Sequence, residues 1–272
     1  MRVGFIGLGS QGGPMARRIV EAGHPTTLWA RRAATLEPFA DTPATYADTP
    51  AALAARSDLI CLCVVGDEDV RQVLSGPDGV LAGLTHGAVV AVHATVHPDT
   101  CRELAKTVAA AGGTLIDAPV SGGGMGAAAG TLLVMAGGPA EAVRRARPVF
   151  DSYANPVVHL GEVGAGQTAK LLNNLLFTAN LATARSTLAL GAQLGIGPDR
   201  LGEVIAHGTA NSFALGRVVS GGGSLDRLAA HAGHLLRKDV GLVADLAAAA
   251  GADPGVVLST ADATLAMMNH PR

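Results

Sequence analysis

The feature that most constrains this chain is a glycine-rich turn at residues 7–12, with the sequence Gly-Leu-Gly-Ser-Gln-Gly. An apolar, β-forming run at residues 3–6 leads into the turn, and apolar residues at helical spacing follow it over residues 11–22. A strand, a glycine turn and a helix in this order are what a dinucleotide-binding fold requires. The sequence therefore predicts a nucleotide-binding α/β unit.

Each glycine of the turn has its own steric role in such a unit. Gly7 permits the tight turn, Gly9 lets a pyrophosphate approach the backbone, and Gly12 lets the helix pack against the strand. The free N–H groups and the positive dipole end of the helix would then meet the phosphate charge. We therefore predict that all six residues of the turn bind the cofactor: Gly7, Leu8, Gly9, Ser10, Gln11 and Gly12.

The next predicted strand, at residues 26–29, is followed by two arginines, Arg31 and Arg32. A site for NAD usually has an acidic residue about 20 residues after the glycines, where it binds the ribose 2′-hydroxyl. No acidic residue occurs between Glu21 and Glu37. A guanidinium group suits a 2′-phosphate, through paired charged hydrogen bonds. We therefore predict NADP(H) as the preferred cofactor and NAD(H) as the alternative. The other reading of the arginines is a solvated pair that starts the next helix.

Composition and charge exclude several other classes of protein. Of the 272 residues, 49% are hydrophobic and 15% are charged, a balance typical of a globular chain with a substantial core. The formal net charge of −2 gives no electrostatic basis for binding nucleic acid or an anionic membrane surface. Polar residues interrupt the longest apolar stretch, at residues 168–194, so no membrane span is expected. Because the glycine turn leaves no room for a signal peptide, we expect a soluble, cytoplasmic protein.

The three cysteines and nine histidines give no pattern of a disulfide framework or a metal site. Cys61 and Cys63 lie two residues apart in an apolar strand, so both side chains should point to one face as core residues. An odd count without C-x-x-C spacing fits neither disulfides nor zinc. His231 and His234 could share a helical face, but two ligands do not make a metal site. We therefore predict no bound metal.

The order of the predicted elements divides the chain into two domains. Strand-like runs alternate with helical patterns up to about residue 160, which implies crossover connections and a mainly parallel sheet covered on both faces. Strands are predicted at residues 2–6, 26–29, 44–46, 58–64, 88–92, 113–117, 131–136 and 156–160, and helices at 11–22, 48–56, 67–75, 97–111 and 139–150. Later helices are predicted at 168–194, 198–207, 212–219, 225–251 and 254–269. The predicted fold is thus α/β: a doubly wound Rossmann domain at residues 1–163 and an all-helical domain at 164–272, joined through the long helix.

Two further segments carry groups suited to chemistry. In residues 117–130, a predicted strand ends in Ser121 and a run of glycines, whose bare N–H groups can form a concavity for a carboxylate. In residues 161–174, Lys170 falls in the first turn of the long helix, with Asn174 one turn further on. An amine beside an apolar run loses part of its hydration, which disfavours its charge and suits it to proton transfer. The alternative readings are a glycine-rich β-turn and a surface lysine with a paired asparagine.

Three motifs in this order resemble the β-hydroxyacid dehydrogenases over essentially the whole chain. They are the glycine turn with Pro14-Met15-Ala16, the stretch Asp117 to Gly138, and the run Gly164-x-Gly166-x-x-x-Lys170-x-x-x-Asn174. The resemblance implies that Lys170 is the catalytic lysine and that Asn174 helps to hold the substrate. It also implies that Ser121, Gly122 and Gly123 bind the substrate carboxylate.

The resemblance further implies roles for residues outside these motifs. Val64, Val65 and Asp69 match the loop over the cofactor ribose, and Thr95 matches the threonine near the nicotinamide. Lys238 matches the lysine that the helical domain places against the cofactor.

The chain also departs from the family pattern at three positions. Ala30-Arg31-Arg32 replaces the Asn-Arg-Thr or Asn-Arg-Ser that accompanies NADP, and Ala94-Thr95 replaces Ser-Thr. His231 replaces an aromatic residue at a position that would border the substrate, which leaves the preferred substrate side chain open.

We therefore predict an NADP-dependent oxidoreductase that transfers hydride between the nicotinamide and a small 3-hydroxy acid or the corresponding semialdehyde. Lys170 would serve as the general acid and base. Two alternatives are an imine reductase, a related fold that usually lacks this lysine, and a cofactor-binding interaction module without turnover. The presence of Lys170 argues against both. The resemblance implies a homodimer or homotetramer that binds a small carboxylate substrate. Charge and hydropathy predict neither nucleic acid nor a membrane as partner.

Overall fold

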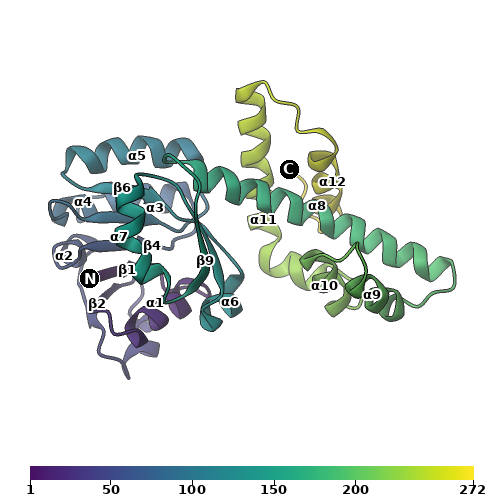
Figure 1. The fold of residues 1–272 in the computed structure, drawn as a ribbon, viewed down its shortest axis with the longest axis horizontal. Helices are drawn as coiled ribbons and strands as arrows, with labels where there is room; N and C mark the ends of the chain where they lie inside the picture. The colour runs from purple at the N-terminus through teal and green to yellow at the C-terminus, as the bar shows by residue number, and fades with distance from the viewer. The chain divides into compact units, whose positions relative to one another are not determined.

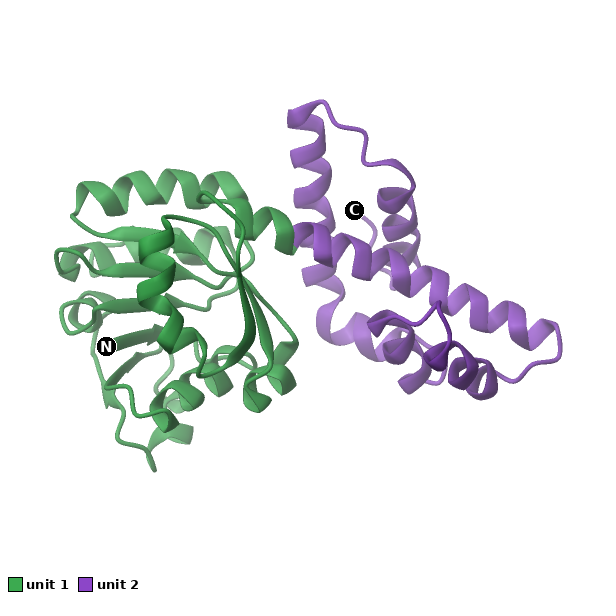
Figure 2. Cartoon of the chain, viewed as in Figure 1, with its two compact units in different colours: residues 1–170 green, residues 171–272 purple.

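The computed structural model describes all residues from Met1 to Arg272. The chain forms two compact units, unit 1 at residues 1–170 and unit 2 at residues 171–272, coloured green and purple in Figure 2. Every strand belongs to unit 1, and unit 2 is all helical. This confirms the predicted fold class. The functional domain boundary after residue 163 stays a prediction.

Unit 1 is built on a six-stranded parallel sheet with the strand order β3-β2-β1-β4-β5-β6. Its strands are β1 (Val3–Ile6), β2 (Thr26–Trp29), β3 (Thr45–Tyr46), β4 (Leu59–Leu62), β5 (Val89–Val92) and β6 (Thr114–Asp117). The order reverses between β1 and β4, and Ile6 at the end of β1 pairs in register with Trp29 and Leu62. The loops that follow these strands therefore leave from one edge, at the switch point where open α/β sheets bind ligands.

Helices cover both faces of this sheet, because successive strand residues point to opposite sides. Phe5 and Cys61 join the core beneath α1 and α7, whereas Ile6 and Leu62 join the core beneath α3 and α5. Cys63 packs against the same core as Cys61, as predicted. The helices of unit 1 are α1 (Gly12–Glu21), α2 (Pro50–Ala54), α3 (Asp67–Ser75), α4 (Val80–Gly83), α5 (Pro98–Ala110), α6 (Gly123–Ala129) and α7 (Ala140–Phe150), with 3-10 helices η1 (Ala33–Thr35) and η2 (Glu37–Phe39) (Figure 1).

A second sheet of three strands follows the first, in the order β7-β8-β9. Its strands are β7 (Val120–Ser121), β8 (Leu132–Ala136) and β9 (Ala154–His159). β7 runs antiparallel to β8, and β8 parallel to β9. The prediction of one mainly parallel sheet is wrong for this part of the chain. Pro119, which has no N–H to donate, separates β6 from β7, and the two sheets are paired through an isolated bridge between Asp117 and Gly137.

Unit 2 has its own core, formed by apolar residues from α8, α10, α11 and α12. The helices of this part are α8 (Ala165–Gln193), α9 (Pro198–His207), α10 (Phe213–Ser220), α11 (Asp226–Ala250) and α12 (Gly255–Met267). Each agrees with its predicted range to within a few residues. None of them combines the length and the hydropathy needed to span a bilayer.

Candidate active site

The glycine turn joins β1 to α1, and its three glycines differ in the space around them. Gly7 has a φ of +98°, and a Cβ there would lie 2.2 Å from the carbonyl oxygen of Cys63. A Cβ on Gly12 would lie 1.9 Å from the carbonyl oxygen of Gly7. A Cβ on Gly9 would meet no atom within 4 Å. The fold itself thus requires the first and third glycines, whereas the second borders open space.

The start of α1 fits the pyrophosphate of a dinucleotide. No side chain caps this helix at its N-cap residue Gln11, and its first turn contains no acidic residue. The positive end of the helix dipole is therefore not neutralised by a carboxylate of its own first turn. Free backbone donors next to a glycine with open space above it form an anion site of the kind that dinucleotides occupy.

The structure brings several predicted cofactor residues to this edge of the sheet. The guanidinium Nη2 of Arg31 lies 3.2 Å from Oδ1 of Asp69, which joins the loop after β2 to α3. The side chain of Arg31 is 63% exposed, so most of its donors face solvent. Arg32 is also exposed, and Val64 and Val65 follow the end of β4.

Ser121 ends β7 and leads into the predicted carboxylate-binding segment. Gly122 and Gly123 follow with φ values of +129° and +65°, and the short helix α6, which the sequence analysis did not predict, starts at Gly123. A Cβ on Gly124 would lie only 2.5 Å from the carbonyl oxygen of Ser10. The segment after Ser121 therefore packs directly against the glycine turn between β1 and α1.

Lys170 and Asn174 lie on α8, four residues apart and so one turn apart on one face. Both are half-buried. Nδ2 of Asn174 donates to Oδ2 of Asp239 at 2.6 Å, and its Oδ1 accepts from Nδ2 of Asn173 at 3.0 Å. Asp239 lies on α11 with only 4% of its surface exposed. A buried carboxylate therefore fixes how the amide of Asn174 points.

Helix α11 also carries Lys238, which was predicted to contact the cofactor, and His231, which was predicted to border the substrate. Nζ of Lys238 lies 3.1 Å from Oδ1 of Asp239, an ion-pair distance, yet this buried oxygen accepts no hydrogen bond. His231 is exposed, and its ring Nδ1 lies 2.8 Å from the carbonyl oxygen of Arg227, in position to donate to it within the same helix.

No three His, Cys, Asp or Glu side chains of the chain lie together in a group that could hold a metal ion.

Sequence reasoning assigned no role to three buried polar side chains: Asp117 and Gln167 in unit 1, and Asp239 in unit 2. Asp239 replaces an apolar residue in the buried stripe of α11 that contains Leu236 and Val240, and that break in the pattern is a signal that could have identified it. Asp117 and Gln167 bond to groups 47 to 73 positions away along the chain. No local pattern reveals contacts of that separation.

Two protein-family models match consecutive parts of the chain. Residues 2–161 match the NAD-binding domain of 6-phosphogluconate dehydrogenase. Residues 164–270 match the NAD-binding domain of NADP-dependent 3-hydroxyisobutyrate dehydrogenase. Together they cover nearly the whole chain.

Individual proteins give the same result. A 3-hydroxyisobutyrate dehydrogenase of Pseudomonas aeruginosa is 34% identical over 247 residues, which cover 88% of this chain and 83% of that protein. The structure of Mycobacterium tuberculosis 3-hydroxyisobutyrate dehydrogenase with L-serine superposes with a TM-score of 0.86 at 28% identity, covering 99% of this chain and 94% of that one. An imine reductase of Streptomyces aurantiacus reaches a TM-score of 0.69 over 99% of this chain and 98% of that one, but at 20% identity it shares the fold alone.

Proposed function

This chain belongs to the β-hydroxyacid dehydrogenase family and is an NAD(P)-dependent dehydrogenase that acts on a CH–OH group, and we propose that it uses NADP(H) and a small 3-hydroxy acid. The same reaction in reverse reduces the corresponding semialdehyde. The substrate would be a short carboxylate whose hydroxyl lies on the carbon β to the carboxyl group. Two relatives support this class, because one is named for 3-hydroxyisobutyrate and another was solved with L-serine, also a 3-hydroxy acid.

One observation carries the proposal: the segment that starts at Ser121 packs against the glycine turn. A Cβ on Gly124 would lie 2.5 Å from the carbonyl oxygen of Ser10, so the two segments are in close contact at this point. A carboxylate held by Ser121 and the N–H groups of Gly122 and Gly123 would therefore lie beside a dinucleotide held at the turn. Such fixed positioning supplies the entropic part of catalysis.

Lys170 is the proposed general acid and base. In oxidation its neutral amine accepts the proton of the substrate hydroxyl, and in reduction its ammonium returns a proton to the carbonyl oxygen. Asn174, whose amide is oriented by Asp239, would hold the same oxygen from the next turn of α8. The nicotinamide, when bound, supplies the hydride chemistry.

The proposed cofactor residues divide by the part of the dinucleotide that they would hold. The six residues of the glycine turn, Gly7 to Gly12, would bind the pyrophosphate, while Val64, Val65 and Asp69 would border the ribose. Arg31 and Arg32 would bind the 2′-phosphate, which is the basis for proposing NADP(H) over NAD(H). Thr95 and Lys238 would lie against the nicotinamide end, and His231 would border the substrate.

We also propose that the chain forms a homodimer or homotetramer. Light scattering should then give a mass of two or four times 27.2 kDa.

A substrate panel tests this proposal. The purified protein is assayed with 3-hydroxyisobutyrate, L-serine, glyoxylate and succinic semialdehyde, each with NADP(H) and with NAD(H). We expect turnover of at least one of the two 3-hydroxy acids, 3-hydroxyisobutyrate and L-serine, since glyoxylate and succinic semialdehyde correspond to a 2-hydroxy and a 4-hydroxy acid. The Arg31→Ala variant should lose at least about tenfold in its preference for NADP(H), the cost of one charged hydrogen bond. Reduction of cyclic imines without turnover of any hydroxy acid would identify an imine reductase instead. Tight NADPH binding without any turnover would identify a non-catalytic binding module.

A further inference from the structure

The helix that carries Lys170 begins on a buried carboxylate from another element. Asp117, the last residue of β6, is fully buried, and its Oδ1 accepts from the backbone N–H of Gly164 at 2.7 Å. Its Oδ2 accepts from the backbone N–H of Gln167 at 2.8 Å. Burial raises the pKa of Asp117, while these N–H groups oppose that rise. Asp117 thus serves as the cap of α8, and it explains why the helix begins at Ala165, three residues earlier than predicted.

The side chain of Gln167, in the first turn of α8, is fully buried and uses both ends of its amide. Its Oε1 accepts from the backbone N–H of Val96 at 3.1 Å, and its Nε2 donates to the backbone carbonyl of Ala94 at 2.8 Å. These two backbone groups flank Thr95 on either side. One side chain therefore fixes the loop after β5 in the way that a neighbouring strand would.

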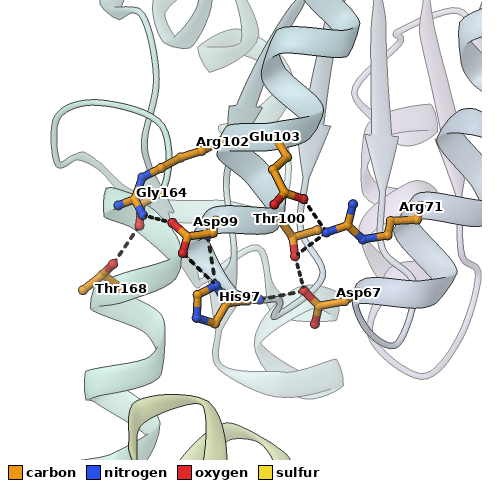
Figure 3. Close-up of polar contacts among 9 residues, drawn as sticks. All are labelled: Asp67, Arg71, His97, Asp99, Thr100, Arg102, Glu103, Gly164 and Thr168. Atoms are coloured by element: carbon orange, nitrogen blue, oxygen red, sulfur yellow. Dashed lines mark hydrogen bonds and ion pairs between the residues drawn. The ribbon is translucent and has the colours of Figure 1, made fainter. Parts of the chain in front are cut away.

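Arg102 of α5 also lies close to this turn (Figure 3). Gly164 has a φ of +96°, and a Cβ there would lie 3.0 Å from the guanidinium of Arg102, which donates to Asp99 at 2.5 Å. The hydroxyl of Thr168 donates to the carbonyl oxygen of Gly164 at 2.9 Å. The start of α8 is thus hydrogen-bonded to Asp117 of β6 and closely approached by Arg102 of α5, which leaves little freedom for the backbone that carries Lys170.

We propose that Gln167 is a positioning residue that ties Thr95 and Lys170 into one rigid arrangement. Lys170 lies three residues after Gln167, close to one helical turn. The same turn of α8 therefore carries the amine of Lys170 and the side chain that is hydrogen-bonded to the loop around Thr95. A lysine has a long, flexible side chain, so its amine is placed accurately only if its backbone is fixed. A misplacement of about 1 Å can cost about 100-fold in rate. This inference rests on the proposed role of Lys170.

The test replaces Gln167 by methionine, which keeps a similar volume and loses both hydrogen bonds. The matched control is Gln193→Met, at the exposed end of the same helix. We expect Gln167→Met to lower kcat by about 10- to 100-fold, with less than a threefold change in the Kd for NADPH, while Gln193→Met stays within twofold of the parent. A kcat for folded Gln167→Met within twofold of the parent would overturn the inference, because it would show a purely structural role.

Two further measurements show whether Gln167 acts through Lys170. In the Lys170→Ala background, adding Gln167→Met should change the residual kcat by less than twofold. A decrease in kcat as large as the one that Gln167→Met causes in the parent would contradict the inference. In the free protein, reductive methylation of Lys170 is followed by peptide mass spectrometry and compared with the exposed Lys106 of the same molecule. We expect Gln167→Met to raise the Lys170-to-Lys106 labelling ratio at least threefold, and an unchanged ratio would oppose the inference. If Lys170→Ala itself retains activity within tenfold, the proposed function fails, whatever Gln167 does.

A second variant keeps the inference testable if Gln167→Met does not fold. Gln167→Glu, when protonated, carries the same acceptor and donor as the amide, but when ionised it cannot donate to Ala94. Because position 167 is fully buried, the pKa of a carboxyl group there should be raised by up to about 3–5 units from its usual value of about 4.3, so the group is protonated at pH 6 and ionised by pH 9. The kcat relative to the parent should therefore be close to one at pH 6 and fall at least tenfold by pH 9, with the near-ultraviolet circular dichroism unchanged. A ratio that stays constant over this range would contradict the inference.

Discussion

At the scale of single residues, the buried His93 shows how an ionisable group is held neutral in the core of unit 1. Its ring Nδ1 lies 2.6 Å from the carbonyl oxygen of Ala118, and its Nε2 lies 3.2 Å from the hydroxyl of Tyr153. With the proton on Nδ1, the neutral imidazole donates to Ala118 and accepts from Tyr153, so both nitrogens are satisfied. Burial lowers the pKa of His93 from 6.5 to about 4, although the bond to Ala118 opposes this.

This pKa gives a pH-dependent contribution to stability. Because the folded state has the lower pKa, the unfolded chain binds the proton first, and stability is lost as the pH falls from 6.5 towards 4. Between pH 7 and pH 5 the loss attributable to His93 is about 2 kcal/mol. Urea unfolding at both pH values should show this loss in the parent and a smaller one in His93→Gln, whose amide does not titrate. Equal losses in the two proteins would show that His93 is not the group responsible.

The residues of the candidate site were predictable to different degrees. Gly9 and Lys170 stand in motifs with a fixed spacing, so the sequence alone singles them out. The role of Thr95 came only from the family resemblance. Gln167 was not predicted at all, because its importance lies in bonds to residues 71 and 73 positions earlier, which no reading of local sequence reveals.

At the scale of elements, the turn between β1 and α1 contains two glycines whose roles differ in a measurable way. Gly12 has no space for a side chain, since a Cβ would lie 1.9 Å from the carbonyl oxygen of Gly7. Gly9 has open space instead. One glycine is thus needed by the fold, and the other is needed only if a ligand approaches its backbone.

The substitutions Gly9→Ala and Gly12→Ala form a matched pair that tests this difference. We expect Gly12→Ala to destabilise the protein by about 1–3 kcal/mol or more, the cost of overpacking, as measured by urea unfolding. Gly9→Ala should change the free energy of unfolding by less than about 0.5 kcal/mol. It should nevertheless weaken NADPH binding at least about tenfold, as measured by cofactor fluorescence, because one close contact to a phosphate is lost. An unchanged Kd for Gly9→Ala would argue against a dinucleotide at this turn.

Most elements were predictable because their signals are local. Short apolar runs, which form the fully buried strands β1, β4 and β5, lie within the element that they define. Stop signals such as Gly195 (φ +86°) lie within a few residues of the end of α8. The sheet β7-β8-β9 was not predicted, because the two-residue strand Val120–Ser121 is fixed only by pairing with Leu133 and Val134. Helix α6 was missed because a glycine-rich stretch is typical of a loop.

At the scale of the whole molecule, the two units have separate cores and separate contributions to the proposed reaction. Unit 1 contains the glycine turn, the Ser121 segment and Lys170, whereas Asn174, Lys238 and Asp239 belong to unit 2. α8 is continuous through the boundary between Lys170 and Leu171, so the proposed catalytic lysine and its neighbouring asparagine come from different units on one helix. The proposed reaction therefore depends on one amine, that of Lys170, at the end of unit 1.

The most direct measurement is the single-turnover rate of Lys170→Ala with saturating NADPH and the best semialdehyde of the panel. Lys106→Ala, on the exposed face of α5, is the matched control. General acid–base catalysis is worth about 10²- to 10⁴-fold, so the rate should fall by that factor while the Kd for NADPH changes less than threefold. A Lys170→Ala rate within about tenfold of the parent would contradict the assignment of Lys170 as the proton donor and acceptor.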